Sequence, residues 1–225
     1  QVALLTPIVK AFITDNAWTS TSSCMQVFGG HGFIREWGME QYVRDARIAQ
    51  IYEGANGVQA MDLVGRKLAQ NGGRALQAFF KIITEEVATA KGSPRTASIA
   101  EALEKANSQL QAATMWLMQN GMTNPNNAGA GSHHYMHMMG IVAVGLMWLR
   151  MGVAAAERLD AGADDAAWLE AKLTTARFYA ERIMPDAGAL RRAKQDVLDD
   201  IGTGVCIDPD RCGRRRRIHH TIIGG

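Results

Sequence analysis

The 225-residue chain has little cysteine and almost no net charge. Its three cysteines, Cys24, Cys206 and Cys212, are odd in number and isolated, which argues against a disulfide framework and favours a reducing cytoplasm. A formal net charge of +2 is too small to indicate binding to nucleic acid or to an anionic membrane. No signal peptide opens the chain, and Gln1 lies inside an apolar-periodic segment, so we expect the C-terminal part of a longer protein.

The sequence also lacks long apolar runs and strand-like alternation. Its most apolar segment, residues 138–149, ends at Arg150 and is shorter than the roughly 20 residues that span a bilayer, so we expect a buried helix and no membrane span. No segment alternates apolar and polar residues as a half-buried strand does. With 47% hydrophobic and 20% charged residues, the composition is that of a globular protein with a sizeable core. We predict an all-α fold.

Helical periodicity covers most of the chain. We expect helices over residues 7–28, 39–51, 58–68, 76–87, 96–120, 132–159 and 164–183. Asn71-Gly72-Gly73 breaks the pattern and marks the main boundary. Residues 120–131 are rich in glycine and asparagine, which predicts a loop.

Two of these helices have predicted roles in the core. The helix at 132–159 is apolar nearly all round, which places it at the centre of a bundle. In the helix at 164–183, the residues that we expect to face inward are Trp168, Leu169, Leu173 and Phe178.

Residues 51–59 combine one carboxylate with apolar and very small neighbours. Glu53 follows Ile51 and Tyr52, whose partial desolvation of the acid would make it a stronger base. The small residues from Gly54 to Gly57 allow another molecule to approach the backbone closely. A lone glutamate near a helix start is usually solvated or interacts with the helix dipole, so these features alone do not assign a function.

Two further motifs precede Glu53: Gln26-Val27-Phe28-Gly29-Gly30-His31-Gly32 and Arg44-Asp45-Ala46-Arg47. In this order and at this spacing, residues 10–68 closely resemble the C-terminal helical domain of flavin-dependent acyl-CoA dehydrogenases. The resemblance implies that Glu53 removes the α-proton of an acyl-CoA thioester while the β-hydrogen leaves as hydride to FAD.

The resemblance also implies the binding residues. In the family, the Gln-x-x-Gly-Gly loop contacts the FAD of a neighbouring subunit; here that loop is Gln26, Val27, Phe28, Gly29 and Gly30. The other expected FAD-binding residues are Ala55, Asn56 and Gly57, and Gly54 is expected to bind the substrate. Family members commonly have threonine in place of Ala55, and many have a longer polar residue in place of Gly57, so we expect backbone contacts there.

These expectations define a function and its partners. The chain is expected to be the C-terminal part of an FAD-dependent acyl-CoA dehydrogenase that makes a trans-2-enoyl-CoA and passes electrons to an electron-transferring flavoprotein. A loop shared between subunits implies a homodimer or homotetramer. Two alternatives stay open: a non-catalytic helical module for oligomerisation or binding, and an acyl-CoA oxidase that passes its electrons to oxygen.

We divide the chain into three parts. Residues 1–71 are the partial dehydrogenase C-terminal helical domain. Residues 72–192, with helical text such as Gly145-Leu146-Met147-Trp148, resemble the additional helical domain of a branch that includes methylthiopropanoyl-CoA dehydrogenases and broad-range acyl-CoA dehydrogenases. Residues 193–225 fit neither part, and we interpret them as an out-of-frame or cloning-derived tail; intact mass together with the source DNA sequence would test this.

Three histidines have a metal-like spacing. His133 and His137 share a helix face at i and i+4, and His134 lies between them. Zinc requires a third or fourth ligand, and no carboxylate or cysteine lies at suitable spacing nearby in the sequence. We therefore predict no metal site, and assign these histidines to helix-start capping and packing.

Overall fold

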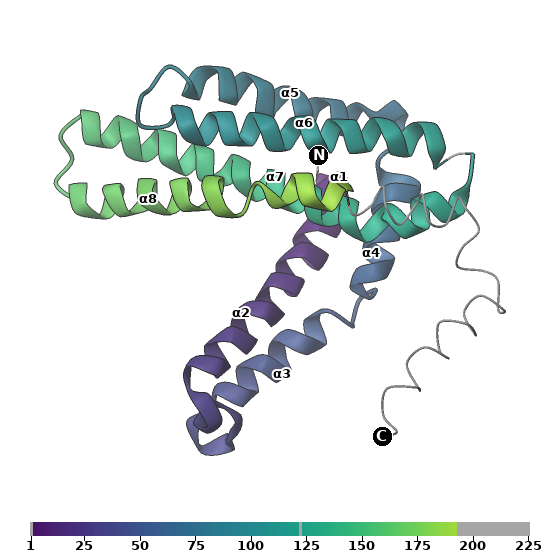
Figure 1. The fold of residues 1–225 in the computed structure, drawn as a ribbon, viewed down its shortest axis with the longest axis horizontal. Helices are drawn as coiled ribbons and strands as arrows, with labels where there is room; N and C mark the ends of the chain where they lie inside the picture. The colour runs from purple at the N-terminus through teal and green to yellow at the C-terminus, as the bar shows by residue number, and fades with distance from the viewer. Residues whose placement is uncertain (1, 122, 193–225) are drawn as a thin grey trace, which may run out of the picture.

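The computed structural model describes residues 2–121 and 123–192. None of these residues forms a strand, and the fold is all-α as the sequence predicts. Figure 1 shows two regions: a hairpin of α2 (Ile13–Val27) and α3 (Met39–Ala49) that projects to one side, and a bundle of longer helices. The interpretation of residues 193–225 lies outside the described residues and stays a prediction.

The first helical segment begins before the hairpin, at Val2, and not at Pro7 as the sequence predicted. It consists of α1 (Val2–Pro7), a π-helical turn η1 (Ile8–Phe12) and α2, in direct succession. Pro7 has no N–H group to donate to the preceding turn, and the wider π turn begins at the next residue.

Short helical turns complete the first region. The tip of the hairpin holds η2 (Gly29–Phe33) and η3 (Arg35–Trp37). After α3, the chain enters α4 (Asn56–Asp62), which continues as the π turn η4 (Leu63–Lys67). The expected break follows in η5 (Gln70–Gly73), where Asn71, Gly72 and Gly73 have φ values of 54°, 68° and 73°.

The bundle contains α5 (Arg74–Ala90), α6 (Ala97–Asn120), α7 (Pro125–Asp160) and α8 (Ala166–Arg182). Helix α7 contacts the other three bundle helices and also η1, α4 and η4 of the first region. Its predicted central place is confirmed. By length and composition α7 is the one described helix that could cross a membrane, yet 56% of its most apolar window is buried in this fold. Such burial is typical of a bundle's core helix.

Two details of the bundle differ from the sequence predictions. Residues 125–131 are helical and not a loop, because Pro125 occupies the first turn and the Asn124 side chain caps it by accepting a hydrogen bond from the Asn126 N–H (3.0 Å). Trp168 and Phe178 point outward, with 55% and 59% of their surface exposed.

The helix geometry explains this outward direction. The buried residues of α8 are Leu169, Leu173, Ala176 and Ala180, spaced by four, three and four positions. At 100° per residue, Trp168 and Phe178 fall outside that face. Lys172 lies over the Trp168 ring at 4.9 Å, which covers part of it.

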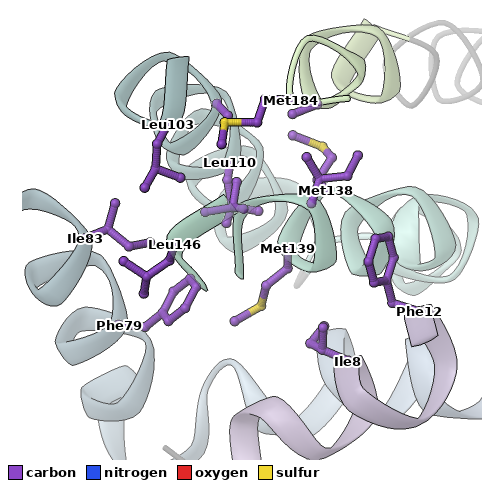
Figure 2. Close-up of a cluster of buried hydrophobic side chains, with 14 of the residues drawn as sticks. Ile8, Phe12, Phe79, Ile83, Leu103, Leu110, Met138, Met139, Leu146 and Met184 are labelled. Atoms are coloured by element: carbon purple, nitrogen blue, oxygen red, sulfur yellow. The ribbon is translucent and has the colours of Figure 1, made fainter. Parts of the chain in front are cut away.

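One hydrophobic core joins both sides of the boundary at residue 71. Ile8 and Phe12 of the first region lie against Met138 and Met139 of α7, and all four are buried (Figure 2). Gly140 of α7 faces Phe12 so closely that a Cβ atom there would collide with the ring. The division into residues 1–71 and 72–192 therefore stays a prediction about sequence units, which pack as one body.

Candidate functional site

The loop between α3 and α4 presents Glu53 on a constrained backbone. Two hydrogen bonds to the Ile48 carbonyl, from the Ile51 N–H (3.0 Å) and the Tyr52 N–H (3.2 Å), close the end of α3. Glu53 then has φ 53° and Gly54 has φ 85°, both in the left-handed region. A non-glycine residue pays for this conformation, which is found at functional sites more often than elsewhere.

Lys10 and Asn56 hold this loop against the first helical segment. The Lys10 Nζ donates to the Gly54 carbonyl (2.7 Å) and to the Asn56 Oδ1 (2.7 Å). Its ammonium group therefore contacts the backbone one residue after Glu53. The buried Asn56 Nδ2 in turn donates to the Ala11 carbonyl (3.2 Å) and to the Thr14 Oγ1 (2.9 Å). These bonds fix the loop to a rigid helix.

Asp15 connects the same loop to the bundle. Its Oδ1 accepts hydrogen bonds from Gln50 Nε2 and Asn56 Nδ2, both at 2.7 Å, and its Oδ2 lies 2.9 Å from His137 Nε2 on α7. Burial raises the pKa of Asp15, but the hydrogen bonds from Gln50, Asn56 and His137 outweigh it and hold the pKa below its ordinary value. Asp15 is therefore a carboxylate at neutral pH.

The Glu53 backbone leaves one donor available. Its carbonyl accepts a hydrogen bond from Gln59 Nε2 (3.1 Å), whereas its N–H has no partner among the described residues. The Glu53 side chain is exposed, as are Ile51 and Tyr52 at 51% and 55%. The expected desolvation of Glu53 by these two residues is therefore not provided by the described chain.

The predicted flavin loop lies at the other end of α3. Gln26 and Val27 end α2, and Phe28, Gly29 and Gly30 follow at the hairpin tip (Figure 1). All five are exposed. Because α3 has 11 residues, its length of about 16 Å separates this loop from the end that carries Glu53. The chain does not bring the two groups together.

The small residues of both loops offer room for a large ligand. Gly30 and Gly57 are exposed, and a Cβ atom at either position would meet nothing within 4 Å. Ala55 is exposed as well, and apolar surface is available at Val27, which is 85% exposed. These features fit contacts to a planar, partly apolar cofactor such as FAD. Asn56 offers less, because its side chain is committed to Lys10, Asp15 and Thr14 and its backbone N–H donates to the Gln50 carbonyl (3.1 Å).

A histidine pair lies beside this network. The rings of His133 and His137 are neighbours on α7, with centroids 4.4 Å apart and planes tilted by 47°, and Asp15 supplies a carboxylate next to His137. Partial loss of hydration and the nearby His137 lower the pKa of His133, although Asp15 opposes this. Local sequence around the histidines does not reveal this carboxylate, since Asp15 is 122 positions from His137 and reaches it only because η1 and the start of α2 lie beside α7.

Comparison with known proteins covers nearly all of the described chain. Residues 3–68 match the family model described as "Acyl-CoA dehydrogenase, C-terminal domain", and residues 79–201 match "Acetyl-CoA dehydrogenase C-terminal like". A 3-methylmercaptopropionyl-CoA dehydrogenase from Ruegeria pomeroyi is 36% identical over 200 residues, which is 88% of this chain and 34% of that protein.

Two more relatives share this extent. The broad-specificity linear acyl-CoA dehydrogenase FadE5 of Mycobacterium tuberculosis is 32% identical over 206 residues, 88% of this chain and 34% of that protein. A butyryl-CoA dehydrogenase of Syntrophomonas wolfei is 30% identical over 195 residues, which is 84% of this chain and 31% of that protein. The chain spans about a third of the length of these relatives.

Proposed function

The chain belongs to the acyl-CoA dehydrogenase family, and from this premise we propose that its parent protein is an FAD-dependent acyl-CoA dehydrogenase with Glu53 as the base. The observation that supports the assignment is the constrained loop: Glu53 has a left-handed φ of 53°, the Gln59 side chain donates to the Glu53 carbonyl, and Lys10 donates to the Gly54 carbonyl. A base that must meet one carbon atom of a bound thioester requires such fixed placement.

Each group of the loop has a distinct role in this proposal. The Glu53 carboxylate takes the α-proton of the acyl-CoA thioester. The unpaired Glu53 N–H donates a hydrogen bond to the thioester carbonyl and stabilises the negative charge that develops on its oxygen. Gly54, exposed and with φ 85°, lets the substrate approach the backbone. FAD supplies the hydride acceptor, since no protein side chain accepts hydride. The product is a trans-2-enoyl-CoA.

The distance between the two loops supports a shared site between subunits. Gln26 to Gly30 would contact the FAD of a neighbouring copy, while Ala55, Asn56 and Gly57 would lie against the FAD beside Glu53, with the exposed Ala55 and Gly57 making the direct contacts. We accordingly propose a homodimer or homotetramer. An electron-transferring flavoprotein as acceptor and a cytoplasmic location belong to the same proposal.

The direct test uses the full-length parent, its Glu53→Gln variant and Glu101→Gln, which changes an exposed glutamate of α6, as the matched control. Anaerobic bleaching of the flavin absorbance is followed across acyl-CoA thioesters of different chain length. We expect bleaching in the parent and in Glu101→Gln. Loss of a general base typically costs 10²–10⁴-fold in rate, so Glu53→Gln should bleach at least about 100-fold more slowly with FAD still bound. Unchanged bleaching in Glu53→Gln would refute the assignment of the base.

The alternatives give different results in the same experiments. An acyl-CoA oxidase would consume oxygen and form peroxide during turnover, whereas a dehydrogenase requires an added electron acceptor. A full-length protein without bound flavin would support the non-catalytic helical module.

For the 225-residue chain by itself we expect no bound FAD, because the two flavin-contacting loops are exposed and far apart. The measurement is the absorbance ratio between the flavin band and protein after purification. Flavin at near-equal molar amounts would contradict this expectation, and the full-length parent is the positive control.

A further inference from the structure

We propose that Asp15, His133 and His137 form a binding site for a divalent transition-metal ion such as Zn²⁺, which would bridge α2 and α7. One ligand atom from each residue can be chosen so that all three lie within 4.8 Å of one another. The site is separate from Glu53 and does not depend on its role.

The spacing of the three groups is close to what zinc requires. Ligand atoms about 2.0–2.1 Å from a tetrahedral zinc ion lie roughly 3.3 Å from one another. The Asp15 Oδ2 and His137 Nε2 are already 2.9 Å apart. His133 is exposed, so a change of its side-chain torsions can bring its ring nitrogen to the third position without moving the backbone. Its exposure also leaves a path from solvent and room for water as the fourth ligand.

The carboxylate is oriented by hydrogen bonds that a metal would not disturb. Asp15 Oδ1 is occupied by the side-chain amides of Gln50 and Asn56, which leaves Oδ2 directed at the histidines. Outer partners of this kind orient the ligands of known metal sites. The ion would replace the present hydrogen bond between Asp15 and His137 with two coordinate bonds.

The ligand set also indicates the type of metal. Two imidazole nitrogens and one carboxylate oxygen suit Zn²⁺, Co²⁺ and Ni²⁺, whereas Ca²⁺ and Mg²⁺ require sites made of oxygen atoms. His133 and His137 lie one helical turn apart on the long helix α7, so the helix fixes their backbone positions and only the His133 ring has to reorient on binding.

The experiment measures Zn²⁺ binding to the metal-free full chain by calorimetry and Co²⁺ binding by visible absorption. His133→Ala is the test variant, because this exposed residue can be truncated without opening the core. His134→Ala is the control, since it removes a neighbouring histidine of α7 that is not in the cluster. We expect His133→Ala to weaken Zn²⁺ binding at one site by at least roughly 10–100-fold, the loss that is typical when an outer-shell partner of a metal ligand is removed. The His134→Ala variant should bind Zn²⁺ at that site as tightly as the unchanged chain.

Cysteines and histidines near the C-terminus, Cys206, Cys212, His219 and His220, are potential competing ligands. Cobalt distinguishes them, because thiolate ligands add a sulfur-to-cobalt charge-transfer band that the proposed site lacks. Thermal unfolding supplies an independent readout: Zn²⁺ should raise the Tm of the unchanged chain and of His134→Ala more than that of His133→Ala. Equal affinity, stoichiometry and Tm shift in all three proteins, or thiolate-bound cobalt alone, would overturn the proposal.

Discussion

The side chain of Asn56 joins three segments of the chain. It accepts a hydrogen bond from Lys10 and donates to Ala11, Thr14 and Asp15, with 8% of its surface exposed. Two of these partners are charged, and such hydrogen bonds are the stronger class. Asn56→Ala should therefore lower the free energy of unfolding by about 2–3 kcal/mol, because it leaves buried polar groups without their partners.

The measurement for Asn56→Ala is urea denaturation followed by far-ultraviolet circular dichroism. Asn126→Ala is the matched control, since Asn126 is exposed in the first turn of α7. Its effect should lie within about 0.5 kcal/mol. Equal effects of the two substitutions would show that the network around Asn56 contributes nothing measurable.

Which site residues the sequence could reveal depends on sequence distance. Glu53, Gly54 and the glycines of the flavin loop occur in short motifs that can be read from neighbouring positions. Lys10, Asp15 and His137 contribute through contacts made only when η1, α2, the loop and α7 meet, with 44 positions between Lys10 and Gly54 and 122 between Asp15 and His137. No local pattern distinguishes such residues from ordinary polar positions. Even the motif residue Asn56 proved to direct its side chain inward.

At the scale of elements, the packing of α7 against η1 depends on one glycine. A Cβ atom at Gly140 would enter the space of the Phe12 ring, which is itself buried. Gly140→Ala should therefore destabilise the protein by about 1–3 kcal/mol, the usual cost of overpacking, although alanine is the better helix former.

The control for Gly140→Ala lies on the same helix. At Gly129, which is exposed, a Cβ atom would meet nothing within 4 Å, so Gly129→Ala should stabilise the protein by about 0.5–1 kcal/mol. Thermal or urea unfolding of both variants gives the comparison. Stabilisation by both substitutions would mean that Phe12 moves aside at no cost and that the close crossing is not required.

The helices themselves were largely readable from periodicity, while their ends and faces were not. Every long helix was expected near its observed position, because apolar residues recur at helical spacing. The start of α7 was missed because Pro125 and Asn124, residues typical of loops, act here as a first turn and its cap. Trp168 and Phe178 were placed inward on hydrophobicity alone, although the helix rotation turns Trp168 to the side of α8 and Phe178 to the face opposite the buried one.

At the scale of the whole molecule, the two sequence units share one core. The main cluster of buried residues includes Leu4, Ile8 and Leu63 from the first unit together with Leu103, Leu110 and Leu146 from the second. The contact between the two units includes Phe12 of the first unit against Gly140 of the second. Each fully buried leucine or isoleucine is stabilised by about 1.5–3 kcal/mol relative to an exposed one, so separating the units would cost several such contributions.

A shared core predicts cooperative unfolding of the described chain despite its two family matches. Differential scanning calorimetry should give a single transition in which the calorimetric enthalpy equals the van't Hoff enthalpy. The hairpin of α2 and α3 contributes little to this transition, because α2 has no buried residue and α3 has one, Val43. Two resolved transitions, or a calorimetric enthalpy well above the van't Hoff value, would instead assign independent stability to residues 1–71 and 72–192. The Gly140→Ala variant also distinguishes these two cases. With one cooperative core, the substitution lowers the single Tm. With two independent units, the Tm values of both transitions would stay unchanged.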